Sequence, residues 1–357
     1  EEKYGKGTQR VYAFCLLLLS LLSFAVQLLA GGLVIATLTG LPYLLVTILF
    51  AVTAVIYAHW SGLKASLITG TVKMLALFVV GTLVAIFVAM NSGTVIAGLS
   101  SINGDVHSLF SGAGSAIFWS FGLSATIGLM SGPFGDQAFW QRAFAVKRKY
   151  VKRSFLVGSL LFAIVPLTMS VLGFALAGAG IEVDNLQLTN IAAITTWLPE
   201  WVLLFFVAAI IIGLLSTLDS SLCAAASIIG SDFSKPHQSL RNARVSMLAL
   251  ALLGIAIANI PDLTIVKLFI IYGTLRASTL IPTLLIIGTR YEYNQRAIST
   301  GVIAALVVGL PLSAYGNMTG NVPYIVGGSI AVLVISGMVT VIGSRIANSK
   351  NEVAING

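Results

Sequence analysis

Long apolar stretches alternate with short polar gaps along the whole chain. A helix needs about 20 apolar residues to cross the hydrocarbon core of a bilayer, and ten stretches come near that length. The longest external gaps, residues 91–112 and 180–200, leave no room for a separate catalytic domain. The pattern predicts an all-α integral membrane protein with about ten transmembrane helices, at residues 11–38, 41–58, 65–90, 113–130, 154–179, 201–229, 245–260, 263–287, 297–314 and 322–342.

Lysine and arginine occupy only every second gap between these stretches. Of the 20 basic residues, 18 lie in or near one alternating set of gaps and none lies in the other set. Cytoplasmic loops of membrane proteins carry such an excess of bases. We therefore expect the basic gaps and both ends of this chain on the cytoplasmic side of the cell membrane, whereas the external gaps carry Asp105, Glu182, Asp184, Glu200 and Asp262.

Charged residues are scarce for a soluble protein. They make up 9% of the chain, against roughly 25% in a typical soluble domain. The net charge of +8 therefore indicates basic loops that face anionic lipid heads, not a nucleic-acid partner. No nucleotide loop, catalytic triad or zinc motif appears, and Cys15 and Cys223 both lie in apolar stretches. We expect neither an enzyme nor a disulfide.

The segment 211–227 carries a stripe of small and polar residues on an apolar background. Hydroxyl and carbonyl oxygens are the ligands that a hard, weakly held cation such as Na⁺ requires. The alternative is a helix-packing face on which Ser and Thr bond to their own backbone. Asp219 favours the ion site, because an unpaired carboxylate is costly inside a membrane. The stripe comprises Gly213, Ser216, Asp219 or Ser220, Cys223 and Ser227, with Thr217 one residue round the helix.

Two bases lie within apolar stretches and at membrane depth. Lys73 either snorkels to the cytoplasmic surface or sits in the bundle as a fixed cation or a titrating group. Arg276 lies near the middle of stretch 263–287, where a guanidinium needs a carboxylate, carbonyl oxygens or an anionic substrate as its partner. The alternative is that Arg276 lies in an interrupted helix. As an inward-facing group it favours a solute that bears a carboxylate.

Three motifs in this order resemble a known family of transporters. QLLAGG at 27–32 is followed by IYAHWSGLKA at 56–65, GDQAFWQRAFA lies at 135–145, and LSTLDS lies at 215–220. Together they resemble the sodium:solute symporter family over most of residues 1–290. The resemblance implies a leucine-transporter-type inverted-repeat bundle that binds substrate and ions at mid-membrane.

By the same resemblance, Ser216 and Thr217 supply hydroxyls to a sodium ion and Gly213 adds its carbonyl oxygen. Ser23 matches a position that contacts substrate, and Gln27 lies one turn further along. The resemblance implies sodium-coupled symport of a small polar organic solute by alternating access, with Na⁺ as the coupling ion. It says nothing of the oligomeric state.

The chain departs from the family pattern in two respects. Where the family commonly has T-D-x-x-Q, this chain has Thr69-Gly-Thr-Val-Lys73, so a second sodium site that uses the acid is in doubt. The alternative to sodium coupling is that the Lys73 ammonium, paired with Asp219, takes over part of the cation's role, which would make transport proton-coupled or uncoupled. About three helices that the family places before residue 1 have no counterpart in this chain. A transporter-like membrane sensor, a channel and a membrane enzyme remain as other readings.

Overall fold

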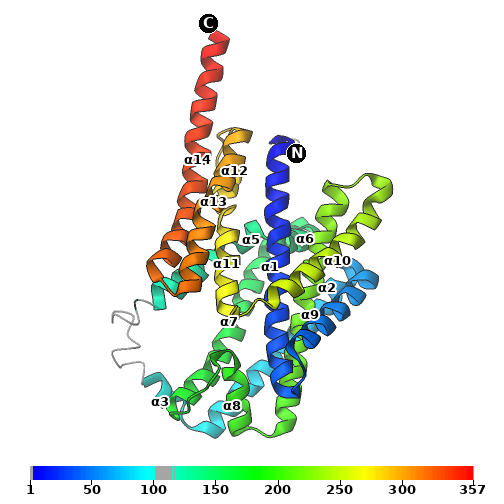
Figure 1. Cartoon of the computed structure of the whole chain (residues 1–357), viewed down its shortest axis with the longest axis vertical. Coiled ribbons are helices and arrows are strands. Elements are labelled where there is room, and N and C mark those ends of the chain that lie inside the picture. The colour runs from blue at the N-terminus through cyan, green and yellow to red at the C-terminus, as the bar shows by residue number, and fades with distance from the viewer. Residues whose placement is uncertain (1–2, 101–114, 116, 357) are drawn as a thin grey trace.

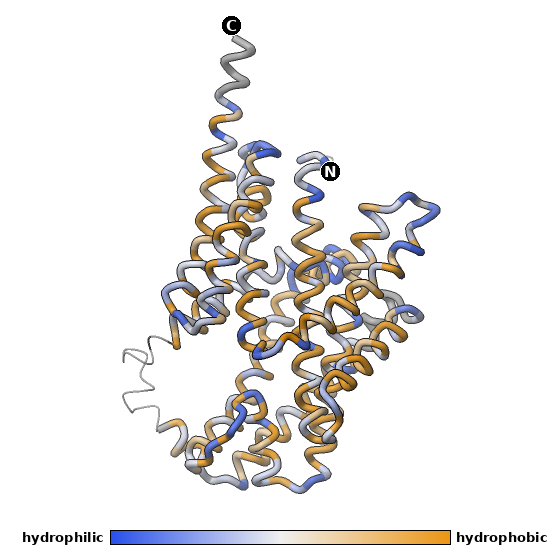
Figure 2. Tube along the Cα trace, viewed as in Figure 1, coloured by the Kyte–Doolittle hydropathy of each residue, from blue (hydrophilic) through white to orange (hydrophobic). Residues whose placement is uncertain are grey.

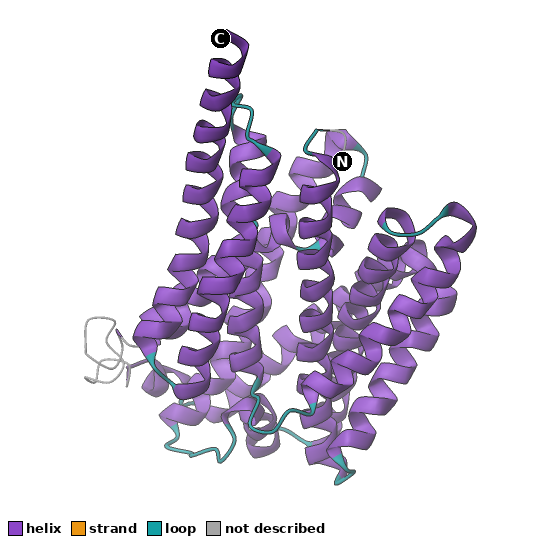
Figure 3. Cartoon of the chain, turned by 45° about the horizontal axis from the view of Figure 1, so that its top comes forward, coloured by secondary structure: helices purple, strands orange, loops and turns teal. Residues whose placement is uncertain are grey.

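The computed structural model describes residues 3–100, 115 and 117–356, and within this part the chain is almost entirely helical and has no strand (Figure 3). The predicted all-α membrane class is confirmed. In the described residues nine helices or helix arms are long and apolar enough to cross a membrane, and each overlaps a predicted stretch. They are Gly5–Thr39, Tyr43–Trp60, Gly70–Ser92, Arg148–Gly178, Glu200–Asp232, Ser239–Ala258, Ile265–Gly288, Gln295–Thr319 and Val322–Ser349.

The tenth predicted stretch, 113–130, begins outside the described residues, where the predicted external Asp105 also lies. Its described portion is the π-helix η2 (Phe118–Leu123) followed directly by α5 (Ser124–Gly135). The chain then becomes extended at Asp136, with φ −123° and ψ 120°, and continues as the short helix α6 (Gln137–Ala145). This stretch therefore ends in a broken helix pair.

Helix α2 (Tyr43–Ser92) joins two predicted spans without a loop between them. Sixteen residues of straight helix cover about 24 Å, yet the ammonium of Lys73 lies 4.5 Å from the ring centroid of Tyr57. The helix must therefore double back between these two residues. The cytoplasmic loop predicted here is wrong in its secondary structure, although the reversal of direction was expected. We call Tyr43–Trp60 the first arm of α2 and Gly70–Ser92 the second arm.

A second broken helix lies in the predicted stretch 263–287. α11 (Ile265–Ala277) ends before Ser278, and α12 (Leu280–Gly288) follows. The interrupted helix, which the sequence left open as the alternative for Arg276, is therefore observed, and Arg276 lies in the last turn before the break.

Glycines bring the two broken segments into close contact. A Cβ atom added at Gly128 of α5 would lie 2.6 Å from the Cα of Gly273 in α11. No side chain fits between two backbones at that distance, and such close approach at small residues is typical of helix packing in membranes.

Helix α9 (Glu200–Asp232) is shared by both large hydrophobic cores. Its C-terminal half contributes Leu218 and Leu222 to a core with α1 (Gly5–Thr39), the first arm of α2, α10 (Ser239–Ala258) and α11. Its N-terminal half contributes Val202 and Phe206 to a second core. The partners there are the second arm of α2, α7 (Arg148–Gly178) and α8 (Thr189–Trp197). The polar stripe therefore lies on a helix that is held along its whole length.

The two ends of the chain lie toward the same end of the molecule (Figure 1). Apolar residues run along the helices, and hydrophilic residues gather at the turns (Figure 2). Large side chains such as Leu160, Leu252 and Val307 are mostly exposed, as expected where lipid is the solvent. The remaining elements are α3 (Val95–Ser100), η3 (Leu186–Leu188), η4 (Pro236–Gln238), α13 (Gln295–Thr319) and α14 (Val322–Asn356).

Candidate ion and solute site

Ser216 and Thr217 present two uncommitted hydroxyls on α9. Both residues are half-buried, and among the described residues neither hydroxyl forms a hydrogen bond. Their neighbours on the same helix behave differently, because Ser220 donates to the carbonyl of Ser216 and Ser231 donates to that of Ser227. Helical Ser and Thr commonly satisfy themselves in this way. The two predicted sodium ligands therefore retain oxygens that are available to an ion.

The second arm of α2 covers this part of α9. A Cβ atom added at Gly70 would lie 3.5 Å from Ser216 Oγ, and one added at Gly213 would lie 3.3 Å from a methyl group of Leu77. Gly70 stands where the family pattern has an acid. Because glycine has no side chain, this position puts no carboxylate beside the hydroxyl of Ser216. Gly213 and Ser216 thus lie in the contact between the two helices, and Thr217 follows Ser216 one residue round α9.

Lys73 and Asp219 form an ion pair one turn further along the same contact. Lys73 Nζ lies 3.5 Å from Asp219 Oδ2, and the two side chains are 16% and 0% exposed. The Ser220 hydroxyl oxygen also lies 3.3 Å from Asp219 Oδ1. The predicted contact between Lys73 and Asp219 is confirmed, so Lys73 is turned into the bundle and Asp219 is not the unpaired carboxylate of the sequence argument. Their part in ion coupling stays a prediction.

The donor set fits a sodium ion in part. Two free hydroxyls and the Gly213 carbonyl are neutral oxygens of the kind that hard cations accept. The ammonium of Lys73 works against an ion at this place. Two unit charges separated by about one helical turn, or 5 Å, repel by about 3 kcal/mol at an effective dielectric constant near 20. Asp219 offsets this repulsion, because it makes the Lys73 side neutral overall.

Ser23 of α1 reaches the other side of α9. Its hydroxyl lies 3.3 Å from that of Ser221, which donates the hydrogen bond. Gln27 lies one turn along α1 and is half-buried. Ser23 therefore contacts α9, whereas Gln27 is placed only by its half-burial on α1, and the role of both in solute binding stays a prediction.

Arg276 has a carboxylate partner, Asp136, which the sequence argument did not identify. The guanidinium donates to Asp136 Oδ2 at 2.9 Å, and the Tyr272 hydroxyl donates to the same oxygen at 2.9 Å. Arg276 also contacts the Tyr272 hydroxyl and lies over its ring, 4.0 Å from the centroid. The predicted pairing role is thus observed. Solute binding by Arg276 remains a prediction, and here the guanidinium already has an acid beside it.

Asp136 joins the two breaks. Its Oδ1 accepts from the backbone N–H of Ala138 and so caps the start of α6, while its Oδ2 holds Arg276. In sequence the only signal was an Asp between a glycine-rich turn and a helix, because the partner lies 140 residues away.

Helix α6 binds the continuation of the polar stripe. Gln141 donates to the hydroxyl of Ser227 at 2.6 Å and to the carbonyl of Cys223 at 3.3 Å. Arg142 donates to Ser220 at 3.3 Å. These residues belong to one of the family-like motifs but were not named as site residues. Their hydrogen bonds hold α6 against the C-terminal part of the stripe.

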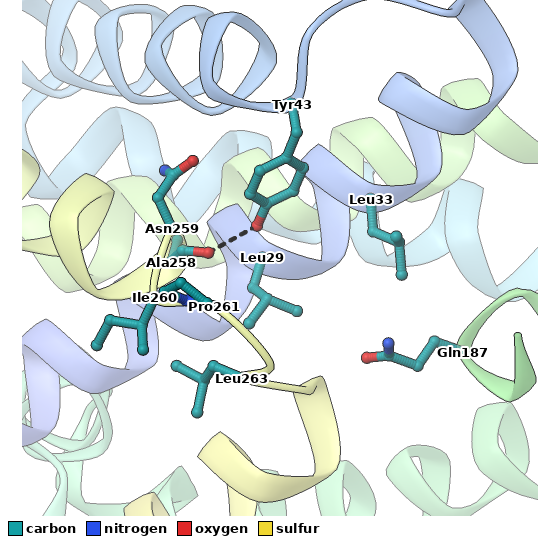
Figure 4. Close-up of a pocket in the computed structure, with 9 residues that line it drawn as sticks. All are labelled: Leu29, Leu33, Tyr43, Gln187, Ala258, Asn259, Ile260, Pro261 and Leu263. Carbon is teal, nitrogen blue, oxygen red and sulfur yellow. Dashed lines mark hydrogen bonds between the residues drawn. The ribbon is translucent and has the colours of Figure 1, made fainter.

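A cavity of about 220 Å³ lies away from this stripe, where α1 and α2 meet the turn between α10 and α11 (Figure 4). Tyr43 donates to the carbonyl of Ala258 at its wall. Gln187 uses its Oε1 to cap the backbone N–H of Ile265. None of the predicted site residues lines this cavity.

A bundle of membrane-crossing helices, with two broken segments held together and uncharged oxygens beside a buried ion pair, is the architecture expected of a secondary transporter. A profile of the sodium:solute symporter family matches residues 1–309. The chain belongs to this family, which consists of transporters and not of enzymes.

Individual relatives agree with this assignment. The sodium/pantothenate symporter of Haemophilus influenzae is 27% identical over 90% of this chain and 70% of its own length. That of Escherichia coli is 24% identical over 85% of this chain and 64% of its own length. A solved Na⁺-coupled sialic acid symporter, in its substrate-bound outward-open state, shares the fold. Its TM-score is 0.69 at 17% identity, over 94% of this chain and 75% of that one.

Proposed function

We propose that residues 1–357 form one membrane transport domain that couples the inward movement of Na⁺ to uptake of a small polar organic solute. The observation that carries this proposal is the pair of half-buried hydroxyls of Ser216 and Thr217, which form no hydrogen bond among the described residues. In this proposal they bind the coupling ion together with the carbonyl oxygen of Gly213.

Alternating access would use the two broken segments. α5 and α6 are tied to α11 by the Asp136–Arg276 pair, so these elements are expected to move as one unit. α6 closes the C-terminal part of the stripe through Gln141 and Ser227. From the charge pattern we expect that part, and both ends of the chain, on the cytoplasmic side. In this proposal the inward release of ion and solute then requires α6 to leave α9.

For the solute, the relatives suggest a first candidate. Two symporters that match most of this chain are named for pantothenate. Solute contacts are expected from Ser23, which touches α9 at Ser221, and from Gln27 one turn along α1. Arg276 would contribute directly only if it exchanged Asp136 for a solute carboxylate, and that exchange would break the tie between the two broken segments.

Uptake by reconstituted protein tests the proposal. Proteoliposomes are given an inward Na⁺ gradient or an equal K⁺ gradient, and entry of labelled pantothenate is followed. Sodium-dependent uptake that is lost in Ser216→Ala/Thr217→Ala, but kept in Ser231→Ala on the exposed end of α9, supports the proposal. Uptake that is equal with either cation contradicts it.

A second candidate is proton-coupled or uncoupled transport. It is favoured by the position of the Lys73 ammonium, 3.5 Å from Asp219 and one turn from Ser216, because a tethered cation there takes over part of an ion's role. Uptake driven by a proton gradient in sodium-free buffer, and abolished in Lys73→Met, would establish this candidate.

A further inference from the structure

The junction between α6 and α7 carries a concentration of positive charge unlike the other loops. Six bases lie between Asp136 and Glu182, and no acid lies among them. Most other basic gaps include an acid, such as Asp232 near Lys235 or Glu292 near Arg290, and the gap at Lys64, which has no acid, holds few bases. The six bases of the α6–α7 junction are Arg142, Lys147, Arg148, Lys149, Lys152 and Arg153, and all six are exposed.

The charges are placed where the fold itself does not stabilise them. Arg148 and Lys149 occupy the first turn of α7, which contains no acidic residue. Cations are unfavourable at this end of a helix, because the helix dipole is positive there. In the described part of the chain none of the bases from Lys147 to Arg153 has a salt bridge. An anion supplied from outside would relieve both effects.

Exposed aromatic side chains accompany the bases. Phe144 at the end of α6 is 81% exposed, and Tyr150 in α7 is 49% exposed. Lys149 lies over the ring of Tyr150, 4.9 Å from its centroid. Aromatic rings beside bases are typical of segments that lie at the headgroup level of a membrane. A soluble anion would match the charge but would leave Phe144 in water.

One side of α6 contacts α9 while the other side, with Phe144, remains exposed. While Gln141 holds Ser227 and the Cys223 carbonyl of α9, Phe144 points away from the protein and remains exposed. A lipid that takes up Phe144 and the bases therefore need not disturb the contact with α9. It would instead oppose the departure of α6, because that movement would withdraw these groups from the headgroups.

We propose that the α6–α7 junction is a docking surface for anionic phospholipids of the cytoplasmic leaflet, and that bound lipid holds α6 closed over α9. This inference concerns regulation, and its test does not depend on which ion or solute the protein carries.

Alkylation of Cys223 reports whether α6 is in place. Gln141 bonds to the carbonyl of Cys223, and both cysteines of the chain are free and buried. With Cys15→Ala as background, the rate of reaction with a maleimide is measured in nanodiscs of phosphatidylcholine containing increasing fractions of phosphatidylglycerol. The rate is expected to fall several-fold as the anionic lipid increases, and the fall should weaken in high salt.

Matched variants assign the response to the junction. In the variant Lys147→Gln/Arg148→Gln/Lys149→Gln, Cys223 should react at the same rate in every lipid mixture. That rate should equal the wild-type rate in phosphatidylcholine alone. Lys235→Gln/Arg241→Gln/Arg244→Gln removes the same charge from another loop and should respond like wild type. Lys147→Arg/Lys149→Arg keeps the charge and should also respond.

Three results would overturn the proposal. The wild-type rate could be insensitive to phosphatidylglycerol, or the junction triple variant could respond as strongly as the control triple. In the third result, soluble glycerol phosphate added to nanodiscs of phosphatidylcholine alone would slow the reaction as much as phosphatidylglycerol does. This would identify a binding site for a free anion.

Discussion

The ammonium of Lys73 and the carboxylate of Asp219 lie 3.5 Å apart and join the second arm of α2 to the middle of α9. The pair lies one turn from Ser216, so the expected ion site and a permanent internal cation share one helix contact. Substitutions in this pair therefore test whether it stabilises the fold or takes part in ion coupling.

Removing Lys73 alone should be costly. Lys73→Met leaves the fully buried carboxylate of Asp219 without its cation, and breaking a buried pair in this way costs about 3–5 kcal/mol. Lys73→Met/Asp219→Leu should recover part of this loss, because no unpaired charge remains.

The exchange Lys73→Asp/Asp219→Lys should also restore part of the function lost in each single variant. Melting temperatures and uptake of all variants form a double-mutant cycle, and strictly additive defects would show that the pair does not act as a unit.

Substitution of Arg276 should destabilise the protein as much as substitution of Lys73. Arg276→Met strands Asp136 at the α5–α6 break, and we expect a loss of about 3–5 kcal/mol. Arg276→Lys should recover little, because an ammonium cannot both stack on Tyr272 and reproduce the planar guanidinium contacts. Lys267→Met in the same helix is the control, since Lys267 reaches only the carbonyl of Asp262 at an exposed position. Equal melting temperatures for the Arg276→Met and Lys267→Met variants would mean that the pair does not hold the two breaks together.

Gly128 should not accept a methyl group. Its Cβ would lie 2.6 Å from the Cα of Gly273, so Gly128→Ala must push α5 and α11 apart, at a cost of about 1–3 kcal/mol. Gly158→Ala in α7 meets nothing within 4 Å and should be neutral or stabilising, since alanine is the better helix former. Thermal unfolding in detergent compares the two, and an equal response would place the α5–α11 contact further apart than described.

Loss of the α6 contact should expose the stripe. Gln141→Ala removes the 2.6 Å bond to Ser227 and the bond to the Cys223 carbonyl, so maleimide should reach Cys223 faster. Gln137→Ala removes only a 3.5 Å contact with Ser227 and should change the rate less. The reverse order would mean that Gln137, and not Gln141, holds α6 on α9.

Much of the fold could be predicted because lipid imposes length and apolarity on each crossing helix. The same rule does not predict the form of the connections: α2 stays helical where a loop was expected, and α11 breaks within an apolar run. The Lys73–Asp219 contact was predicted from the family resemblance, which implies neighbouring helices. The Asp136–Arg276 pair was not, since residues 140 positions apart meet only through the packing of α5 on α11.

The ion site is the central claim, and sodium-dependent stability tests it most directly. A ligand that binds only the folded state raises stability by mass action, so no solute needs to be known. The melting temperature of the reconstituted protein is measured while NaCl replaces KCl at constant ionic strength. We predict a saturable rise specific to Na⁺ that is absent in Ser216→Ala/Thr217→Ala and retained in Ser231→Ala. Identical curves in Na⁺ and K⁺ would contradict the sodium site and leave the Lys73 ammonium as the cation of this contact.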